Sequence, residues 1–295
     1  ARYLKGILLY LSLNTKKLSL VFLTSLLLST YLHADYISEH IELADKGDWG
    51  FQSSLGNMYA LGQEVEQDFN TAIKYWTMAA EQGDTYAQVE LGSIYATGDI
   101  GVPKNVHAAL YWFIEAAALG NVKAQSSLGN IYFNGVGTPQ DNKAAAMWYK
   151  KASFGGYSPA QFNLGLLYDF GAGVEENDVE AVKWYKKSAL QGFAAAQGNL
   201  GHMYAEGEGV EQSDRMAVKW FRKAAQQGHA RSQHTLGVKY SKGEGVAKNQ
   251  ELAVMWWKKS AAQGDVASQT NLSFMYTNGN GVQKSDINAY IWAVM

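Results

Sequence analysis

A fixed spacing governs this sequence. Leu-Gly pairs recur every 36 or 37 residues from Leu55-Gly56 to Leu236-Gly237, and a Leu-Ser pair follows in the same phase at Leu272-Ser273. A second glycine keeps step with them at Gly47, Gly83, Gly120, Gly156, Gly192, Gly228 and Gly264. A period of this length is typical of arrays in which each repeat is one supersecondary unit. We therefore expect six full repeats and a truncated seventh in residues 48–295.

Each repeat has the pattern of two helices joined by a glycine turn. In one repeat, small and apolar residues around Leu200 and Tyr204 recur at helical spacing, and a second such run surrounds Trp220. Gly207 and Gly209 lie between the two runs, where the chain must reverse. One extra residue falls in a turn, at 98–101. The predicted fold is all-α, a solenoid of antiparallel helix pairs.

Three details of the repeat lead to structural expectations. Asp48, Asp84, Asn121, Asp265 and the Ser158-Pro159 pair are expected to cap the starts of helices. The glycine after each leucine predicts a close approach of the partner helix, because a mid-helix glycine costs about 1 kcal/mol relative to alanine. The aromatic phase is expected to be core rather than a ligand platform; it comprises Tyr75, Trp112, Trp148, Trp184, Trp220, Trp256 and Trp292.

The N-terminal segment has the order of a signal peptide. Lys16 and Lys17 precede an apolar stretch from Leu18 to Leu32, which His33 and Ala34 follow, and residues 1–34 contain no acid. We expect cleavage after Ala34, export, and no stable membrane span afterwards, since the stretch is shorter than the about 20 residues a spanning helix needs. Upstream residues 6–13 form a second apolar stretch. Residues 35–47 are expected to form a capping helix, and the array, 48–295, is expected to be truncated at its C-terminal end.

The repeat resembles that of the Sel1-like family, relatives of the tetratricopeptide repeats. The matching residues of one repeat are Ala194-Ala195-Ala196-Gln197, Leu200-Gly201, Tyr204, Gly207-Glu208-Gly209-Val210, Ala217, Trp220-Phe221, Ala224-Ala225 and Gly228. The resemblance implies a right-handed superhelix that acts as a scaffold for protein–protein contacts. Exported bacterial members resemble envelope regulators, assembly adaptors and host-interaction factors, and periplasmic or secreted localisation follows from this likeness.

One cysteine-rich branch of the family is described as binding or hydrolysing β-lactams. This chain has no cysteine and so departs from that branch. A hydrolase or binding protein for β-lactam- or peptidoglycan-related substrates is retained as the alternative. The residues themselves do not indicate an enzyme: the Ser-x-x-Lys, Gly-x-Ser-x-Gly and His-Glu-x-x-His motifs are absent. We expect no catalytic residues, no cofactor and no metal.

Charge bears on the partner. The chain has 25 basic and 27 acidic residues, with a formal net charge of −2. Removal of residues 1–34 would remove four positive charges and make the remainder more acidic. This balance disfavours nucleic acid and anionic lipid as partners. A protein or peptide partner is expected.

Comparison of the repeats with one another suggests a binding site. The residues two before, two after and six after each leucine form a stripe along the first helix. The stripe is mostly small or polar, but in the fourth repeat it is Phe162, Leu166 and Phe170. We hypothesise that these three anchor a partner segment on the concave face. The flanking polar contacts would be Asn130, Asn134, His202 and Glu206. The alternative is that the apolar side chains pack against the neighbouring helix and strengthen the core.

Overall fold

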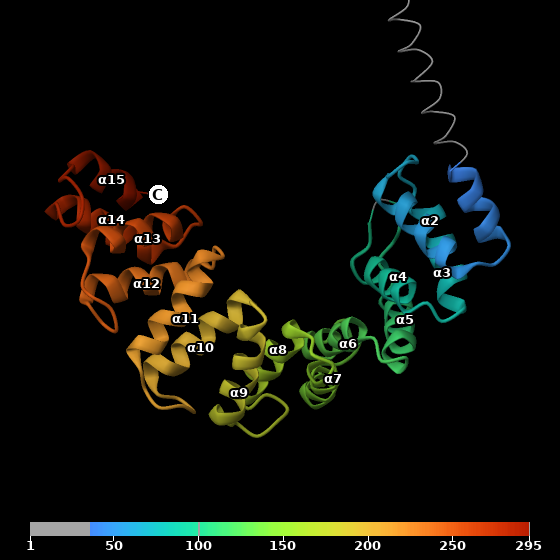
Figure 1. Ribbon diagram of the computed structural model, residues 1–295, viewed down its shortest axis with the longest axis horizontal. Coiled ribbons are helices and arrows are strands. Elements are labelled where there is room, and N and C mark those ends of the chain that lie inside the picture. The colour runs from blue at the N-terminus through green and yellow to red at the C-terminus, as the bar shows by residue number, and fades with distance from the viewer. Residues whose placement is uncertain (1–35, 100, 295) are drawn as a thin grey trace, which may run out of the picture. The chain divides into compact units, whose positions relative to one another are not determined.

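The computed structural model describes residues 36–99 and 101–294 (Figure 1). The predicted signal peptide, residues 1–34, lies outside the described residues. All the regular elements that the structure describes are helices. An isolated β-bridge between Asp99 and Val102 closes the turn in which the sequence carries its extra residue.

The described chain forms two compact units, and helix pairs make up both of them. In residues 36–119, residues 36–45 are helical and are followed by α2 (Trp49–Leu61), α3 (Phe69–Glu81), α4 (Thr85–Thr97) and α5 (Val106–Ala118). The unit that begins at Gly120 contains α6 (Val122–Asn134), α7 (Asn142–Phe154), α8 (Ser158–Asp169), α9 (Asp178–Leu190), α10 (Ala194–Glu206), α11 (Asp214–Gln226), α12 (Ala230–Lys242), α13 (Gln250–Ala261), α14 (Val266–Asn278) and α15 (Asp286–Val294). Even-numbered helices are the first helices of the repeats, and odd-numbered ones are the second. Each first helix packs on the second helix of its own repeat, which confirms the predicted α-solenoid.

The helix starts follow the sequence with one exception. The side chains of Asp48, Asp84, Asn121 and Asp265 accept hydrogen bonds from backbone N–H groups of the first turn, as predicted. The expectation for Ser158 is wrong: α8 begins at this residue, so the preceding Tyr157 is the N-cap and makes no side-chain cap bond.

The glycine after each repeat leucine accommodates an aromatic ring from the partner helix. A Cβ atom added to Gly201 of α10 would lie 2.7 Å from a ring carbon of Phe221 in α11. The same clash would occur in every repeat that carries the glycine, with the pairs Gly56–Trp76, Gly92–Phe113, Gly129–Tyr149, Gly165–Tyr185, Gly201–Phe221 and Gly237–Trp257. The close approach of partner helices is therefore confirmed, and it is made by the residue that follows the tryptophan phase.

The tryptophan phase itself belongs to the core, as expected. Tyr75, Trp184, Trp220 and Trp256 are buried, and Trp112, Trp148 and Trp292 are half-buried. In four successive repeats a lysine three residues later lies over the indole ring, 4.2–4.9 Å from its centroid. The lysines are Lys151, Lys187, Lys223 and Lys259. These cation–π contacts hold the ammonium groups at fixed, repeated positions on the surface.

A buried glutamine joins consecutive repeats. The Nε2 group of Gln197 donates to the carbonyl oxygen of Ala189 at the end of α9, and its Oε1 accepts from Gln227 at the end of α11. Gln161 and Gln233 make equivalent pairs of bonds, as does Gln52. Each such glutamine thus connects the preceding second helix to the second helix of its own repeat.

In one repeat this connection is incomplete. Gln88 donates to the carbonyl oxygen of Ala80, but its buried Oε1 accepts no hydrogen bond. The C-cap of α5, where other repeats have the donor glutamine, is Leu119, which is exposed. A buried acceptor without a partner costs about 1–3 kcal/mol.

We predict that Leu119→Gln stabilises the protein by about 1 kcal/mol, because the new amide would donate to Gln88 Oε1. Chemical denaturation compares the free energies of unfolding. The control is the same substitution in a chain that also carries Gln88→Leu, which has no acceptor to satisfy. An equal gain in both backgrounds would contradict the prediction.

We predict that Gly56→Ala destabilises the protein by about 2–3 kcal/mol, although alanine favours helix by about 1 kcal/mol, because the new methyl would overlap the ring of Trp76. Gly50→Ala in the same helix is the matched control. The Cβ there meets only the Asp48 carboxylate, so a change within about 1 kcal/mol is expected. Denaturation followed by tryptophan fluorescence measures both, and equal effects would refute the packing explanation.

Candidate interaction site

Two of the three predicted anchor residues take part in core packing. Phe162 and Leu166 of α8 are half-buried and pack against the cluster formed by α9, α10 and Trp220. The Phe162 ring centroid lies 5.9 Å from that of Tyr185 and 5.3 Å from that of Phe193. Both residues therefore make core contacts of the kind that the packing alternative describes.

Phe170 is placed differently from the other two. It is the C-cap residue of α8, and 72% of its surface is exposed. The three side chains therefore differ in exposure, and the hypothesis that they anchor a partner segment stays a prediction. One of the three is available on the surface, and another, Leu166, reaches a hollow described next.

A hollow of about 230 Å³ lies among α6, α7 and α8. Three of the predicted residues line it: Asn130, Asn134 and Leu166. We call it the asparagine hollow, and its full lining is Asn130, Phe133, Asn134, Tyr149, Asn163, Leu166 and Leu167. The lining combines apolar side chains, here called the floor, with three amide groups, here called the rim. This is the composition of a site that takes a small apolar group and orients it by polar contacts.

Hydrogen bonds fix the orientation of the rim. The Oδ1 atom of Asn130 accepts from the hydroxyl of Tyr149 at 2.7 Å and from Nδ2 of Asn163 at 3.3 Å. The Nδ2 group of Asn134 donates to the backbone oxygen of Asn130. Two groups in the hollow therefore make no bond that the structure describes: the Nδ2 donor of Asn130 and the Oδ1 acceptor of Asn134.

The tyrosine in the hollow is a permanent donor. Burial raises the pKa of Tyr149 to about 12, so its hydroxyl keeps its proton at physiological pH. The first repeat has an equivalent arrangement, in which Oδ1 of Asn57 accepts from Nε1 of Trp76 and from the hydroxyl of Tyr86. A fixed amide two residues after the leucine thus recurs in the array.

The remaining predicted contacts lie away from the hollow. His202 of α10 is half-buried, with its ring against the ring of Phe221 at a centroid distance of 5.0 Å. Burial, with a smaller effect of Arg231, lowers the pKa of His202 to about 4, so the imidazole is neutral at pH 7. Glu206 is exposed at the end of the same helix. His202 thus packs against Phe221, and neither His202 nor Glu206 lines the asparagine hollow.

Sequence reasoning missed four residues of the lining: Phe133, Tyr149, Asn163 and Leu167. The stripe includes only three positions of each first helix, whereas residues of both first and second helices line the hollow. A signal for one of them was present, because asparagine precedes the repeat leucine at Asn163, Asn199 and Asn271. Tyr149 follows the tryptophan phase, and its hydroxyl distinguishes it from Phe113 and Phe221 at the same position.

Within residues 36–99 and 101–294, no group of three or more His, Asp or Glu side chains could hold a metal ion. His234 is bonded instead to Ser268 and lies 3.1 Å from Asp265. None of the described helices is both long enough and apolar enough to cross a bilayer.

Comparison with known proteins assigns the family. The Sel1 repeat model matches seven times, at residues 51–84, 85–121, 122–156, 158–193, 194–229, 230–265 and 266–294. These matches cover most of the chain and coincide with the helix pairs described above. The protein belongs to the Sel1 repeat family, and the resemblance drawn from the repeat motif is confirmed.

Solved structures agree with this assignment. A protective antigen of uropathogenic Escherichia coli strains superposes with a TM-score of 0.71 at 32% identity, over 86% of this chain and 62% of that one. A Sel1 repeat protein from Oxalobacter formigenes gives a TM-score of 0.71 at 33% identity, over 84% of this chain and 72% of the other.

A curated relative matches a shorter stretch. DAP3-binding cell death enhancer 1 of Rattus norvegicus is 34% identical over 91 residues, which are 31% of this chain and 17% of the rat protein. The chain thus spans less than a fifth of that relative. Sel1 repeat proteins generally mediate protein–protein interactions and are typically non-catalytic scaffolds.

Proposed function

We propose that this protein is a non-enzymatic adaptor that binds an extended segment of a partner protein in the asparagine hollow. The observation that carries the proposal is the combination of an apolar floor with one free donor, Asn130 Nδ2, and one free acceptor, Asn134 Oδ1, on an otherwise fixed rim. The family assignment supports it, because Sel1 repeats generally act through protein partners. The name of the rat relative likewise states that it binds another protein.

The chemistry of the rim fits a peptide group. A peptide carbonyl can accept from Nδ2 of Asn130, and a peptide N–H can donate to Oδ1 of Asn134. The volume of about 230 Å³ suits one apolar side chain rather than a larger ligand. The partner segment is therefore expected to carry an apolar residue with its backbone extended across the rim.

The same geometry favours binding over catalysis. The ionisable group that lines the asparagine hollow is Tyr149, and its pKa of about 12 leaves it protonated. A nucleophile needs a neighbouring base or a lowered pKa. The hollow therefore offers nothing that would favour the alternative of a β-lactam or peptidoglycan hydrolase.

Export completes the proposal. The signal-peptide order of residues 1–34 supports a mature chain that begins at Asp35 in the periplasm or outside the cell. N-terminal sequencing of the protein recovered from its native cells is expected to start at Asp35. Recovery of an intact leader from the cytoplasmic fraction would refute export without affecting the binding site.

We predict that Phe133→Ser lowers partner capture at least tenfold, because it removes apolar surface from the hollow. Phe170→Ser, a second exposed phenylalanine outside the hollow, is the matched control and should capture as the parent does. Quantitative affinity capture from native extract, followed by titration of the purified captured protein, measures both. Thermal unfolding checks that each variant remains folded. Loss of capture with Phe170→Ser alone would place the site at the end of α8. Equal capture by the parent and both variants would refute binding in the hollow.

A further inference from the structure

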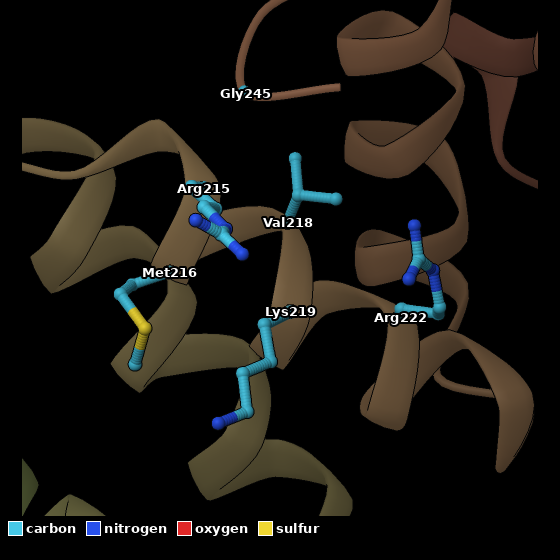
Figure 2. Close-up of a pocket in the computed structure, with 6 residues that line it drawn as sticks. All are labelled: Arg215, Met216, Val218, Lys219, Arg222 and Gly245. Carbon is cyan, nitrogen blue, oxygen red and sulfur yellow. The ribbon is translucent and has the colours of Figure 1, made fainter. Parts of the chain in front are cut away.

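The outward faces of the second helices carry a different kind of surface. In α11, Arg215, Lys219 and Arg222 follow one another at the spacing of a single helix face, and all three are exposed. They line an open hollow of about 520 Å³ together with Met216, Val218 and Gly245. Figure 2 shows the three cationic side chains projecting from the same helix, with the turn at Gly245 beside Arg215.

The same three positions on neighbouring second helices are also mainly basic. We call these positions on α7, α9, α11 and α13 the outer stripe. It consists of Lys143, Met147 and Lys150; Val179, Lys183 and Lys186; Arg215, Lys219 and Arg222; and Glu251, Met255 and Lys258. Eight members are cationic and one is acidic, and all twelve are exposed. The equivalent residues of α3 and α5 are largely neutral: Asn70, Lys74 and Thr77, and His107, Tyr111 and Ile114.

Most of this charge is not neutralised within the protein. Lys183 pairs with Glu180 at 2.9 Å, and Arg222 donates to the hydroxyl of Tyr240. Two carboxylates beside the α11 hollow, Asp214 and Glu244, are both engaged by Lys239. In the described part of the chain, Arg215 and Lys219 have no carboxylate within ion-pair distance. The hollow therefore keeps a net positive potential.

Apolar side chains lie among the cations. Met147, Val179 and Met255 belong to the outer stripe itself, and Phe154 and Leu190 are exposed at the ends of α7 and α9. A soluble polyanion would gain little from these groups. A lipid interface accepts both kinds at once, because basic side chains meet the phosphates while apolar ones enter the boundary of the acyl chains.

We propose that the outer stripe binds the surface of an anionic phospholipid bilayer. The overall charge conceals this site because charge is segregated along the chain: the described residues up to Leu119 hold three lysines against twelve carboxylates. The expectation that anionic lipid is disfavoured used the total charge alone. The distribution of charge favours binding of anionic lipid by the second unit. This binding is contact at the membrane surface and needs no spanning helix. This inference does not depend on the asparagine hollow.

The test is co-sedimentation of the full chain with vesicles of pure phosphatidylcholine and with vesicles containing about one third phosphatidylglycerol. We expect binding that prefers the anionic vesicles at least tenfold and weakens as salt rises from about 0.05 M to about 0.5 M. The apolar stretches 6–13 and 18–32 and the basic residues beside them are common to all variants, and binding to the neutral vesicles measures the contribution of the apolar stretches.

Two neutralised variants locate the site. The triple variant Arg215→Gln, Lys219→Gln and Arg222→Gln should lose about tenfold or more in partitioning. The triple variant Lys150→Gln, Lys183→Gln and Lys186→Gln should lose a comparable amount, and it leaves the Arg222–Tyr240 bond intact. The matched control neutralises three exposed lysines outside the outer stripe, Lys242, Lys248 and Lys284, and should bind as the parent does.

Three outcomes would overturn the proposal. Equal losses in the control would attribute binding to total charge, and equal binding to neutral and anionic vesicles would attribute it to apolar contact. Absence of vesicle binding, together with salt-sensitive binding of polyglutamate that the α11 variant loses, would assign the outer stripe to an acidic protein.

Discussion

The contact between a mid-helix glycine and an aromatic ring sets the distance between the two helices of each repeat. Because Gly201 has no side chain, Phe221 can lie directly on the backbone of the partner helix, and the leucine before the glycine is fully buried beside it. In the seventh repeat both residues of this contact, the glycine and the aromatic residue, are replaced, and the replacements support the packing explanation. Ser273 replaces the glycine and the small Ala293 stands where the ring would be, and both line the same hollow. A larger residue on one side thus accompanies a smaller one on the other.

The fold could be read from the sequence because its determinants are local and repeated. Periodic leucines, glycines and tryptophans indicate the helix faces directly. Because the pattern occurs seven times, a single exception such as the absent cap at Ser158 does not obscure it. The candidate site was less predictable, since it depends on how neighbouring helices share a side chain. The spacing places Phe162 and Leu166 on one face of α8, but it does not show that Phe162 is covered by Phe193 and Tyr185. Total charge is uninformative about surfaces for a related reason, because it ignores where along the array the charges lie.

Two surfaces of different chemistry emerge from one repeated unit. Positions near the leucine of the first helices form a fixed amide rim over an apolar floor, whereas positions that flank the tryptophan of the second helices carry cations. The outer stripe uses none of the buried leucine, glycine and aromatic residues that define the repeat, whereas the asparagine hollow uses one of them, Tyr149. A scaffold with these two faces could hold a partner segment on one while the other meets an anionic surface, and substitutions on each can be made independently.

The buried glutamine has a consequence for how such a chain can change in length. Its two bonds join equivalent points, the ends of successive second helices, so the connection from one repeat to the next is nearly the same at Gln161, Gln197 and Gln233. A duplication or deletion of one whole repeat would therefore recreate an existing junction rather than a new one. Growth of the array by whole repeats would lengthen its surfaces without redesign of the core.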